Sequence, residues 1–295
     1  SAATLIGNPQ NMLIGQTLRL SFAGFLADAL VPAVLGLAVV WGLIHLSVRG
    51  RWRATTPVPP VDAPPLDLWQ TSKGLAILVL LVVGFLFTPV PREVLALGAA
   101  AVLLTSRKMA SRDLIGLVDW HLLVLFVGLF VVNHAVAESG LATQANGALL
   151  AAGVDLGDMR WLFPATAVLS NLVSNVPAGM LLLPHASHPL AGPILALAST
   201  LAGNLLIVGS IANIIVVDQA AALGLRIGWR EHARVGIPVT LATLAIAPAW
   251  LAFRAGLGEI FGVGQIFWPP IDKRSFRGGG LLTHRCGDQR NRYRT

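Results

Sequence analysis

Residues 5–14 of the chain read LIGNPQNMLI, and residues 207–216 read IVGSIANIIV. Gly7 and Asn11 in the first segment correspond to Gly209 and Asn213 in the second at a constant offset (209 − 7 = 213 − 11 = 202). An apolar segment that Gly and Asn interrupt, and that recurs in two halves of a membrane protein, is typical of the midplane binding site of a secondary transporter. We therefore expect two related halves, the first represented only by its end.

The composition indicates a membrane protein. Hydrophobic residues make up 55% of the 295 residues and charged residues 12%, against roughly 25% charged residues in soluble domains. Mean hydropathy is +0.72, and no Asp, Glu, Lys or Arg occurs between Arg160 and Asp218. These values predict an all-α, polytopic protein in the inner (plasma) membrane, with the lipid bilayer around it.

Several function classes are not expected. The single cysteine, Cys286, rules out an internal disulfide, and no CxxC motif or Cys/His cluster indicates a metal site. The net charge of +7 could favour nucleic acid, but the basic residues lie in short loops and in the C-terminal tail, so we expect no nucleic-acid partner. The chain has neither a P-loop motif nor a nucleophile with a base partner, so we expect no enzyme activity, no catalytic residue and no organic cofactor.

Long uncharged runs mark the expected membrane helices, because about 20 apolar residues cross a bilayer core of about 30 Å. Ordinary spans are expected at 22–48, 74–91, 93–106, 120–137 and 235–253. The runs at 161–184 and 189–222 are equally apolar but contain Gly, Pro, Ser and Asn. We predict a re-entrant hairpin over the first of these two runs and a broken helix over the second.

Charge and proline content divide the chain into four parts. Residues 1–48 form the end of the first repeat, 49–73 a Pro-rich cytoplasmic linker, 74–257 the second repeat and 258–295 a Gly/Arg-rich tail. The basic loops fall on one side of the membrane, which the excess of Lys and Arg assigns to the cytoplasm. The two copies of the repeated segment then run in opposite directions, as an inverted repeat. We expect the tail to be disordered and non-native; a tail that binds RNA or anionic lipid is the alternative.

Three polar interruptions form the candidate site. In residues 4–11, Asn8-Pro9 reads as an N-cap followed by proline at the first helical position, so a half-helix is expected to begin at Pro9. In residues 170–177, two Ser-Asn pairs lie four residues apart, hence on one helical face, and Pro177 is expected to break the helix at the hairpin tip.

The third interruption spans residues 203–213. Gly203-Asn204 and Gly209-Ser210 bracket a stretch that is expected to be unwound before a helix restarts near Ile211. Unwound carbonyls and amide oxygens suit a cation, and helix N-termini suit an anion. The alternative for each of these residues taken singly is structural, because small residues and Asn also serve helix packing in membranes.

Other polar residues are weaker candidates. Asp28 reads as an interfacial anchor rather than a proton site, and Glu138 marks a helix end. Asp218 is expected to pair with an arginine of the loop at 226–234. His185 and His188 lie three residues apart without a third ligand, so they are expected at the membrane interface rather than at a metal.

Four segments, TLIGNPQNMLIG, DWHLLVLFVGLFVV, LSNLVSNVPAGMLLLP and LAGNLLIVGSIANIIVVDQA, occur here in the order found in the ion transporter superfamily. They resemble its citrate-transporter-like and arsenite-pump-like branch of anion permeases over residues 1 to about 257. The resemblance implies that each repeat supplies a re-entrant hairpin and a broken helix, which meet at the substrate site. The residues that it implies there are Thr4, Gly7, Asn8, Pro9, Asn11, Ser170, Asn171, Ser174, Asn175, Pro177, Gly203, Asn204, Gly209, Ser210 and Asn213.

Two features depart from the family pattern. Sodium-coupled dicarboxylate members carry Ser-Asn-Thr at the hairpin tip, whereas Val176 follows Ser174-Asn175 here, so the hydroxyl that binds a carboxylate has no counterpart. The hairpin motif precedes its Gly-Asn by 29 residues (204 − 175), and no equivalent precedes the first repeated segment. The first hairpin, with its half of a sodium site, is therefore expected to be absent.

The resemblance implies alternating-access transport of a small anion, such as citrate or arsenite, coupled to Na⁺ or H⁺. The resemblance also leaves room for a homodimer. One alternative is a sodium/proton antiporter of the same superfamily, for which a buried carboxylate pair would be expected. The other is a truncated membrane fragment that does not transport.

Overall fold

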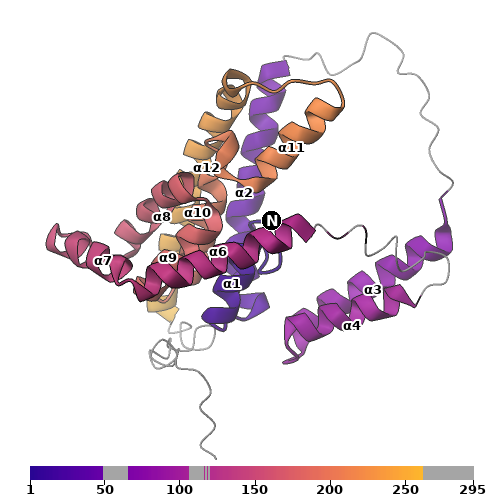
Figure 1. The fold of residues 1–295 in the computed structure, drawn as a ribbon, viewed down its shortest axis with the longest axis horizontal. Coiled ribbons are helices and arrows are strands. Elements are labelled where there is room, and N and C mark those ends of the chain that lie inside the picture. Colours follow the sequence, from indigo (N-terminus) through magenta and orange to yellow (C-terminus); the bar gives the residue numbers. More distant parts are fainter. Residues whose placement is uncertain (49–65, 106–115, 117, 119, 262–295) are drawn as a thin grey trace, which may run out of the picture.

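The computed structural model describes residues 1–48, 66–105, 116, 118 and 120–261, and these residues form helices joined by turns (Figure 1). Within this part of the chain the all-α prediction is confirmed. Residues 49–65, most of the predicted linker, and 262–295, most of the predicted tail, lie outside the described residues. The elements are α1 (Pro9–Thr17), α2 (Phe22–Val48), α3 (Leu68–Phe87), α4 (Arg92–Leu104), α6 (Trp120–Glu138), α7 (Leu141–Ala151), α8 (Met159–Val173), α9 (Asn175–Leu182), η1 (Leu183–His185), α10 (Ala191–Ala202), η2 (Ile207–Gly209), α11 (Ile211–Ala222) and α12 (Trp229–Phe261).

Three described helices are long and apolar enough to cross a membrane: α2, α3 and Trp229–Gly256 of α12. The bounds of α2 match the predicted run at 22–48. Helix α3 begins at Leu68, six residues before the predicted span, because the side chain of Asp67 caps it by accepting a hydrogen bond from the backbone N–H of Gln70 at 3.2 Å. The uncharged run therefore marks the membrane part of the helix and not its full length.

The predicted span at 120–137 corresponds to α6 (Trp120–Glu138), but the sequence does not predict the bend that follows it. Helix α6 ends at Glu138, as expected, but its part from Phe126 is bent by 60° from α7 across a short break. Gly140 lies in the break with φ of +74°, a backbone conformation that glycine adopts without strain. Counted together, α6 and α7 form one broken span or re-entrant pair, which the sequence reading missed because the break contains only Ser139-Gly140.

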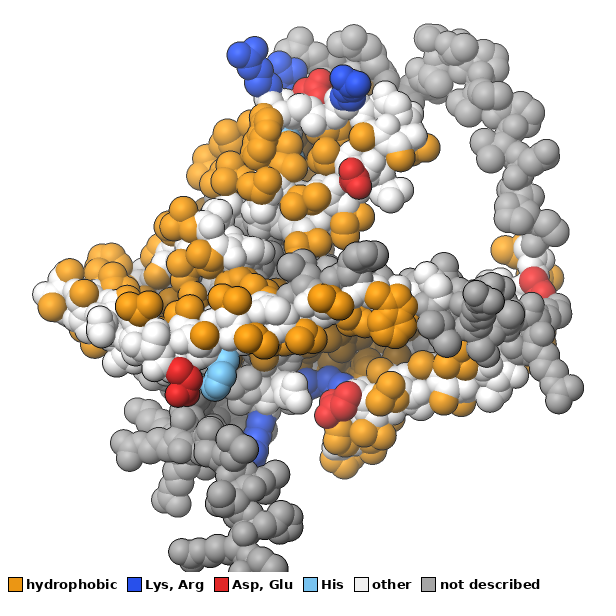
Figure 2. All heavy atoms as spheres, in the orientation of Figure 1, with side chains coloured by type: hydrophobic (Ala, Val, Ile, Leu, Met, Phe, Trp, Pro, Cys, Tyr) orange, Lys and Arg blue, Asp and Glu red, His pale blue; other side chains and the backbone are white. Residues whose placement is uncertain are grey.

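Helix α10 occupies the centre of the core. It packs against α8, α9, α1, α12 and α2, and eleven of its twelve residues are buried, all except Thr200. Helix α11, the continuation of α10 beyond the break, has no buried residue. Figure 2 shows apolar side chains over much of the visible surface, as expected where lipid replaces water.

Helices α2 and α12 pack against each other, and both run steeply upward in the view of Figure 1. Asp28 on α2 is fully buried and forms an ion pair with Arg254 on α12 at 3.0 Å. Trp250 donates its indole N–H to the backbone oxygen of Asp28 at 2.9 Å. The prediction of an interfacial anchor at Asp28 does not account for this burial, which is possible because a partner 226 residues away compensates the charge.

The α3–α4 hairpin contacts the core where α1 leads into α2. The ring of Phe85 lies 5.7 Å from that of Phe22, centroid to centroid. Arg92, at the start of α4, donates a hydrogen bond to the backbone oxygen of Leu20. One apolar and one polar contact therefore attach this hairpin to the connection between α1 and α2.

Candidate substrate and ion site

The first break precedes α1, which begins at Pro9 as predicted. Asn8 is the N-cap, and its side-chain oxygen accepts a hydrogen bond from the backbone N–H of Asn11 at 2.8 Å. The side-chain amide of Asn11, which is fully buried, donates to the backbone oxygens of Thr4 at 2.9 Å and Ser1 at 3.4 Å. Asn11 therefore closes the non-helical segment 1–8 over the start of α1.

The second break separates α10, which ends at Ala202, from α11, which begins at Ile211. This confirms the predicted unwound stretch, which contains one short 3₁₀ turn at η2. The side-chain amide of Asn213 donates to the backbone oxygens of Gly203 at 2.8 Å and Leu206 at 3.2 Å. Asn213 thus holds the second break as Asn11 holds the first.

The two breaks are the same structure at an offset of 202 residues. The offset relates the helix starts (211 − 9), the closing asparagines (213 − 11) and both pairs of acceptor residues (206 − 4 and 203 − 1). A Cβ on Gly7 would collide with Ser1, and one on Gly209 would lie 3.1 Å from the oxygen of Gly203. The glycines of the repeat are therefore needed because the loop backbone approaches each of them closely.

The predicted hairpin is made by α8 and α9, which pack against each other. The helix stops at Ser174, whose φ of +77° and ψ of 160° lie in a region that side chains strain to occupy. Pro177 does not form the break, contrary to the prediction. It lies in the first turn of α9, where its missing N–H would have no helical partner in any case.

The two Ser-Asn pairs do not share one helical face, because α8 ends before Ser174 and Asn175 belongs to the next helix, α9. Asn171, on α8, donates to the backbone oxygens of Ala167 at 3.0 Å and Ala202 at 3.1 Å. With its amide oriented to satisfy its neighbours, Asn175 donates to the backbone oxygens of Ser199 at 3.0 Å and Gly209 at 3.2 Å. The two asparagines therefore bind the second break from either side of the hairpin tip.

The first break meets the second repeat at Thr200 of α10. Its hydroxyl oxygen accepts hydrogen bonds from the side-chain amides of Asn8 and Gln10, both at 3.1 Å. The sequence analysis missed Thr200 and Gln10; the polar pair Ser199-Thr200 in an otherwise apolar helix was the signal that marked the first of them. Within the described residues no hydrogen bond joins the two breaks directly, so α10 connects them.

The remaining predicted residues have smaller roles. Ser170 is buried and donates to the backbone oxygen of Ala167 at 3.2 Å, within its own helix. The backbone oxygen of Asn204 lies 3.0 Å from Nε2 of His232, a residue of α12 that the sequence analysis did not single out. Ser210 is half-buried and precedes α11 without a side-chain cap.

Two amide oxygens at this centre have no hydrogen-bond partner within the described residues. Oδ1 of Asn11 and Oδ1 of Asn171 are both buried, and an unpaired buried oxygen costs free energy. Among the described residues no three His, Cys, Asp or Glu side chains gather closely enough to hold a metal ion. The unpaired acceptors of this centre are therefore neutral amide oxygens.

A protein-family model described as a citrate transporter matches residues 1–193. The chain belongs to the citrate transporter family. The match includes the first break and the hairpin, and it stops before the second break at 203–210. The second copy of the repeated segment, at 207–216, lies beyond the part of this citrate transporter family chain that the family model matches.

Relatives of this family chain are named as transporters or membrane proteins. An uncharacterized transporter of Mycobacterium tuberculosis is 29% identical, over 86% of this chain and 64% of its own length. A Dictyostelium discoideum protein named transporter arsB is 31% identical over 58% of this chain and 31% of its own. Inner membrane protein YbiR of Escherichia coli is 32% identical over 79% of this chain and 58% of its own length. The chain thus spans about two thirds or less of the curated relatives that it matches.

Proposed function

We propose that this chain carries the substrate and ion site of a secondary transporter that moves a small anion across the inner membrane by alternating access. The observation that carries the proposal is the duplicated break, built twice at an offset of 202 residues and joined through α10. Interrupted helices of this kind, in corresponding positions of two halves, are typical of transporter binding sites.

The anion is proposed to bind near the N-termini of α1 and α11. Helix N-termini favour negative charge, because their first N–H groups point outward without helical partners. Ser210 leaves the start of α11 without a side-chain cap, so we propose that the first two backbone N–H groups of α11, those of Ile211 and Ala212, donate to the substrate. Citrate and arsenite are the first anions to test, since the family and one relative bear the names citrate transporter and arsB.

A coupling cation is proposed at the neutral oxygens. The unpaired Oδ1 atoms of Asn11 and Asn171 would provide acceptors for Na⁺. Asn171 lies beside Gly209, since a Cβ built there would be 2.9 Å from its Oδ1. One cation per break would preserve the symmetry of the repeat.

The alternative, cation/proton antiport, has one observation in its favour. Asp28 is a fully buried carboxylate in a candidate span, and its Oδ2 has no partner among the described residues. Its ion pair with Arg254 argues instead for a structural role. An antiporter would move protons without any anion, which separates the two proposals.

The test is uptake of radiolabelled citrate, and separately arsenite, into proteoliposomes of the full-length protein under sodium or proton gradients. We expect gradient-driven uptake that Asn213→Ala reduces at least tenfold while membrane insertion is unchanged. Ala245→Leu, at an exposed site on α12, is the matched control and should transport normally. Equal uptake by Asn213→Ala and the control would refute the site, and proton movement without anion uptake would favour the antiporter.

A further inference from the structure

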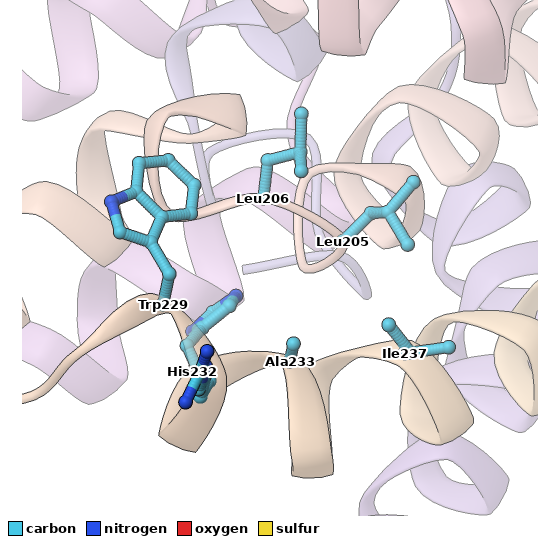
Figure 3. Close-up of a pocket in the computed structure, with 7 residues that line it drawn as sticks. Leu205, Leu206, Trp229, His232, Ala233 and Ile237 are labelled. Atoms are coloured by element: carbon cyan, nitrogen blue, oxygen red, sulfur yellow. The ribbon is translucent and has the colours of Figure 1, made fainter.

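A cavity of about 460 Å³ lies between the second break and the first turns of α12 (Figure 3). Leu205 and Leu206 form the wall that belongs to the break, and Trp229, Ala233 and Ile237 form the wall on α12. None of the three predicted site segments has its Asn or Ser side chains in this lining. The cavity is therefore distinct from the candidate substrate and ion site.

The cavity is apolar except at one end, where Arg230 and His232 complete the lining. His232 already uses Nε2, which lies 3.0 Å from the backbone oxygen of Asn204. Arg230 is exposed, and no carboxylate pairs with it within the described part of the chain. The cavity thus combines an apolar interior with one available cation, a combination that does not suit a small hydrophilic anion.

The surroundings of Arg230 are basic. Arg226 and Arg234 belong to the same turn region, and the single acid, Glu231, is engaged as its Oε2 accepts from the backbone N–H of Gly228 at 2.9 Å. The local charge is +2 (three arginines less one glutamate). Figure 2 shows basic side chains gathered at the end of the molecule where α11 leads into α12 (labelled in Figure 1), next to an apolar surface.

We propose that this cavity binds an anionic phospholipid. An acyl chain would lie against Leu206, Trp229 and Ile237, which are all exposed in the structure, and the phosphate would contact Arg230. Basic pockets at the cytoplasmic face of membrane helices select anionic lipid headgroups. The occupant follows from the place of the cavity: in a membrane protein, lipid covers an exposed apolar surface, and the positive local charge selects the anionic lipids.

Bound lipid would act on the second break. Leu206, one wall of the cavity, also supplies a backbone oxygen to Asn213, and His232 holds the backbone oxygen of Asn204. Contact with an acyl chain would therefore restrict the same residues that Asn213 and His232 already hold. The proposal does not depend on which substrate the protein moves.

The test compares phosphatidylglycerol with phosphatidylcholine of the same acyl chains, added to the purified protein in detergent. Binding is measured by the rise in Tm and by quenching of Trp229 fluorescence with brominated acyl chains, using Trp229→Phe to identify its signal. We expect phosphatidylglycerol to bind more tightly, and Arg230→Gln to weaken it about fivefold. Arg234→Gln, outside the lining, is the matched charge control.

A second pair of variants tests the cavity itself. Ala233 points into the space between the two walls (Figure 3), so Ala233→Phe should fill it and abolish quenching by either lipid. Ala245→Phe, at an exposed site farther along α12, should not. Equal binding of the two lipids, equal loss in Arg230→Gln and Arg234→Gln, or full quenching in Ala233→Phe would each overturn the proposal.

Discussion

Arg254 on α12 donates two hydrogen bonds to the same carboxylate oxygen of Asp28 on α2, at 3.0 and 3.2 Å. The ion pair joins the last described helix of the first half to the last described helix of the second. Asp28 is fully buried, whereas 27% of the Arg254 side chain is exposed, so loss of either partner leaves the other charge without its counter-charge. The pair therefore fixes how the two halves pack, and its removal should be costly.

We expect Asp28→Asn to lower the free energy of unfolding by about 3 kcal/mol, because it leaves Arg254 without a counter-charge. The double variant Asp28→Leu with Arg254→Leu should lose less than the sum of the single variants. Thermal and denaturant unfolding in detergent measures both. Arg160→Gln, which breaks the exposed pair with Asp158, is the control and should leave stability unchanged; an equal loss in both cases would contradict the expectation.

The duplicated asparagines allow a matched comparison of the two breaks. Asn11→Ala should lower the free energy of unfolding by about 2 kcal/mol, because the oxygens of Thr4 and Ser1 lose their donor in a buried place. Asn213→Ala should lower the free energy of unfolding by less, since Asn213 is only half-buried and one of its two acceptors belongs to the exposed Leu206. The unfolding midpoints of the two variants give the comparison, and a larger loss for Asn213→Ala would contradict it.

Gly209 is a test of the close approach in the second break. In Gly209→Ala the new Cβ would lie 2.9 Å from Oδ1 of Asn171 and 3.1 Å from the backbone oxygen of Gly203. We therefore expect the free energy of unfolding to fall by about 2 kcal/mol. Gly98→Ala is the matched control on α4, where a Cβ meets nothing within 4 Å. It should be neutral or stabilise by up to about 1 kcal/mol, because alanine favours a helix. Thermal and denaturant unfolding in detergent measures the free energy of unfolding of both variants.

His188 lies in the turn before α10, and its surroundings lead us to expect that the stability of the folded protein depends on pH. Burial lowers the pKa of His188 below its ordinary value of 6.5, and the charge of Asp158 partly opposes this; burial also lowers the pKa of His185. Nδ1 of His188 accepts a hydrogen bond from the backbone N–H of Leu190 at 3.0 Å, which a protonated ring cannot do. The unfolded chain therefore binds protons more readily than the folded one.

Stability from these histidines should be complete above about pH 6.5 and be lost as the pH falls from there toward the lowered pKa of the folded state. We expect a lower Tm at pH 5.5 than at pH 7.5. His188→Asn should flatten this dependence, because an asparagine oxygen accepts from Leu190 without titrating. If Tm still falls between pH 7.5 and pH 5.5 in the double variant His185→Asn, His188→Asn, other groups cause the pH dependence.

Local signals in the sequence predicted two helix starts, whereas uncharged runs marked helix ends only approximately. The start of α1 at Pro9 follows from a cap and a proline, and the restart at Ile211 follows from the glycines before it. Proline was a poor guide at the hairpin, since Pro177 fits the first turn of α9 and the backbone of Ser174 makes the break. A proline marks a helix end or a helix start, and only the neighbouring backbone distinguishes them.

Contacts between distant residues were not predictable from the sequence. Nothing near Asp28 identifies Arg254 as its partner, and nothing near Asn8 identifies Thr200. These pairs arise from the packing of α2 on α12 and of α1 on α10, which depends on the whole fold. The repeat predicted where the candidate site lies, whereas the tertiary structure decides which side chains complete it.

The unequal burial of α10 and α11 has a mechanical consequence. Helix α10 packs against five helices of the core, whereas α11 has no buried residue and, within the described residues, packs chiefly against η2, next to its N-terminal end. Elements with few buried contacts open and move at the lowest free-energy cost. If the broken helix rotates during transport, as the proposed function implies, α10 is expected to stay in place and α11 to move, with Gly209 and Ser210 between them. The proposed anion-binding end of α11 would then lie next to the moving joint.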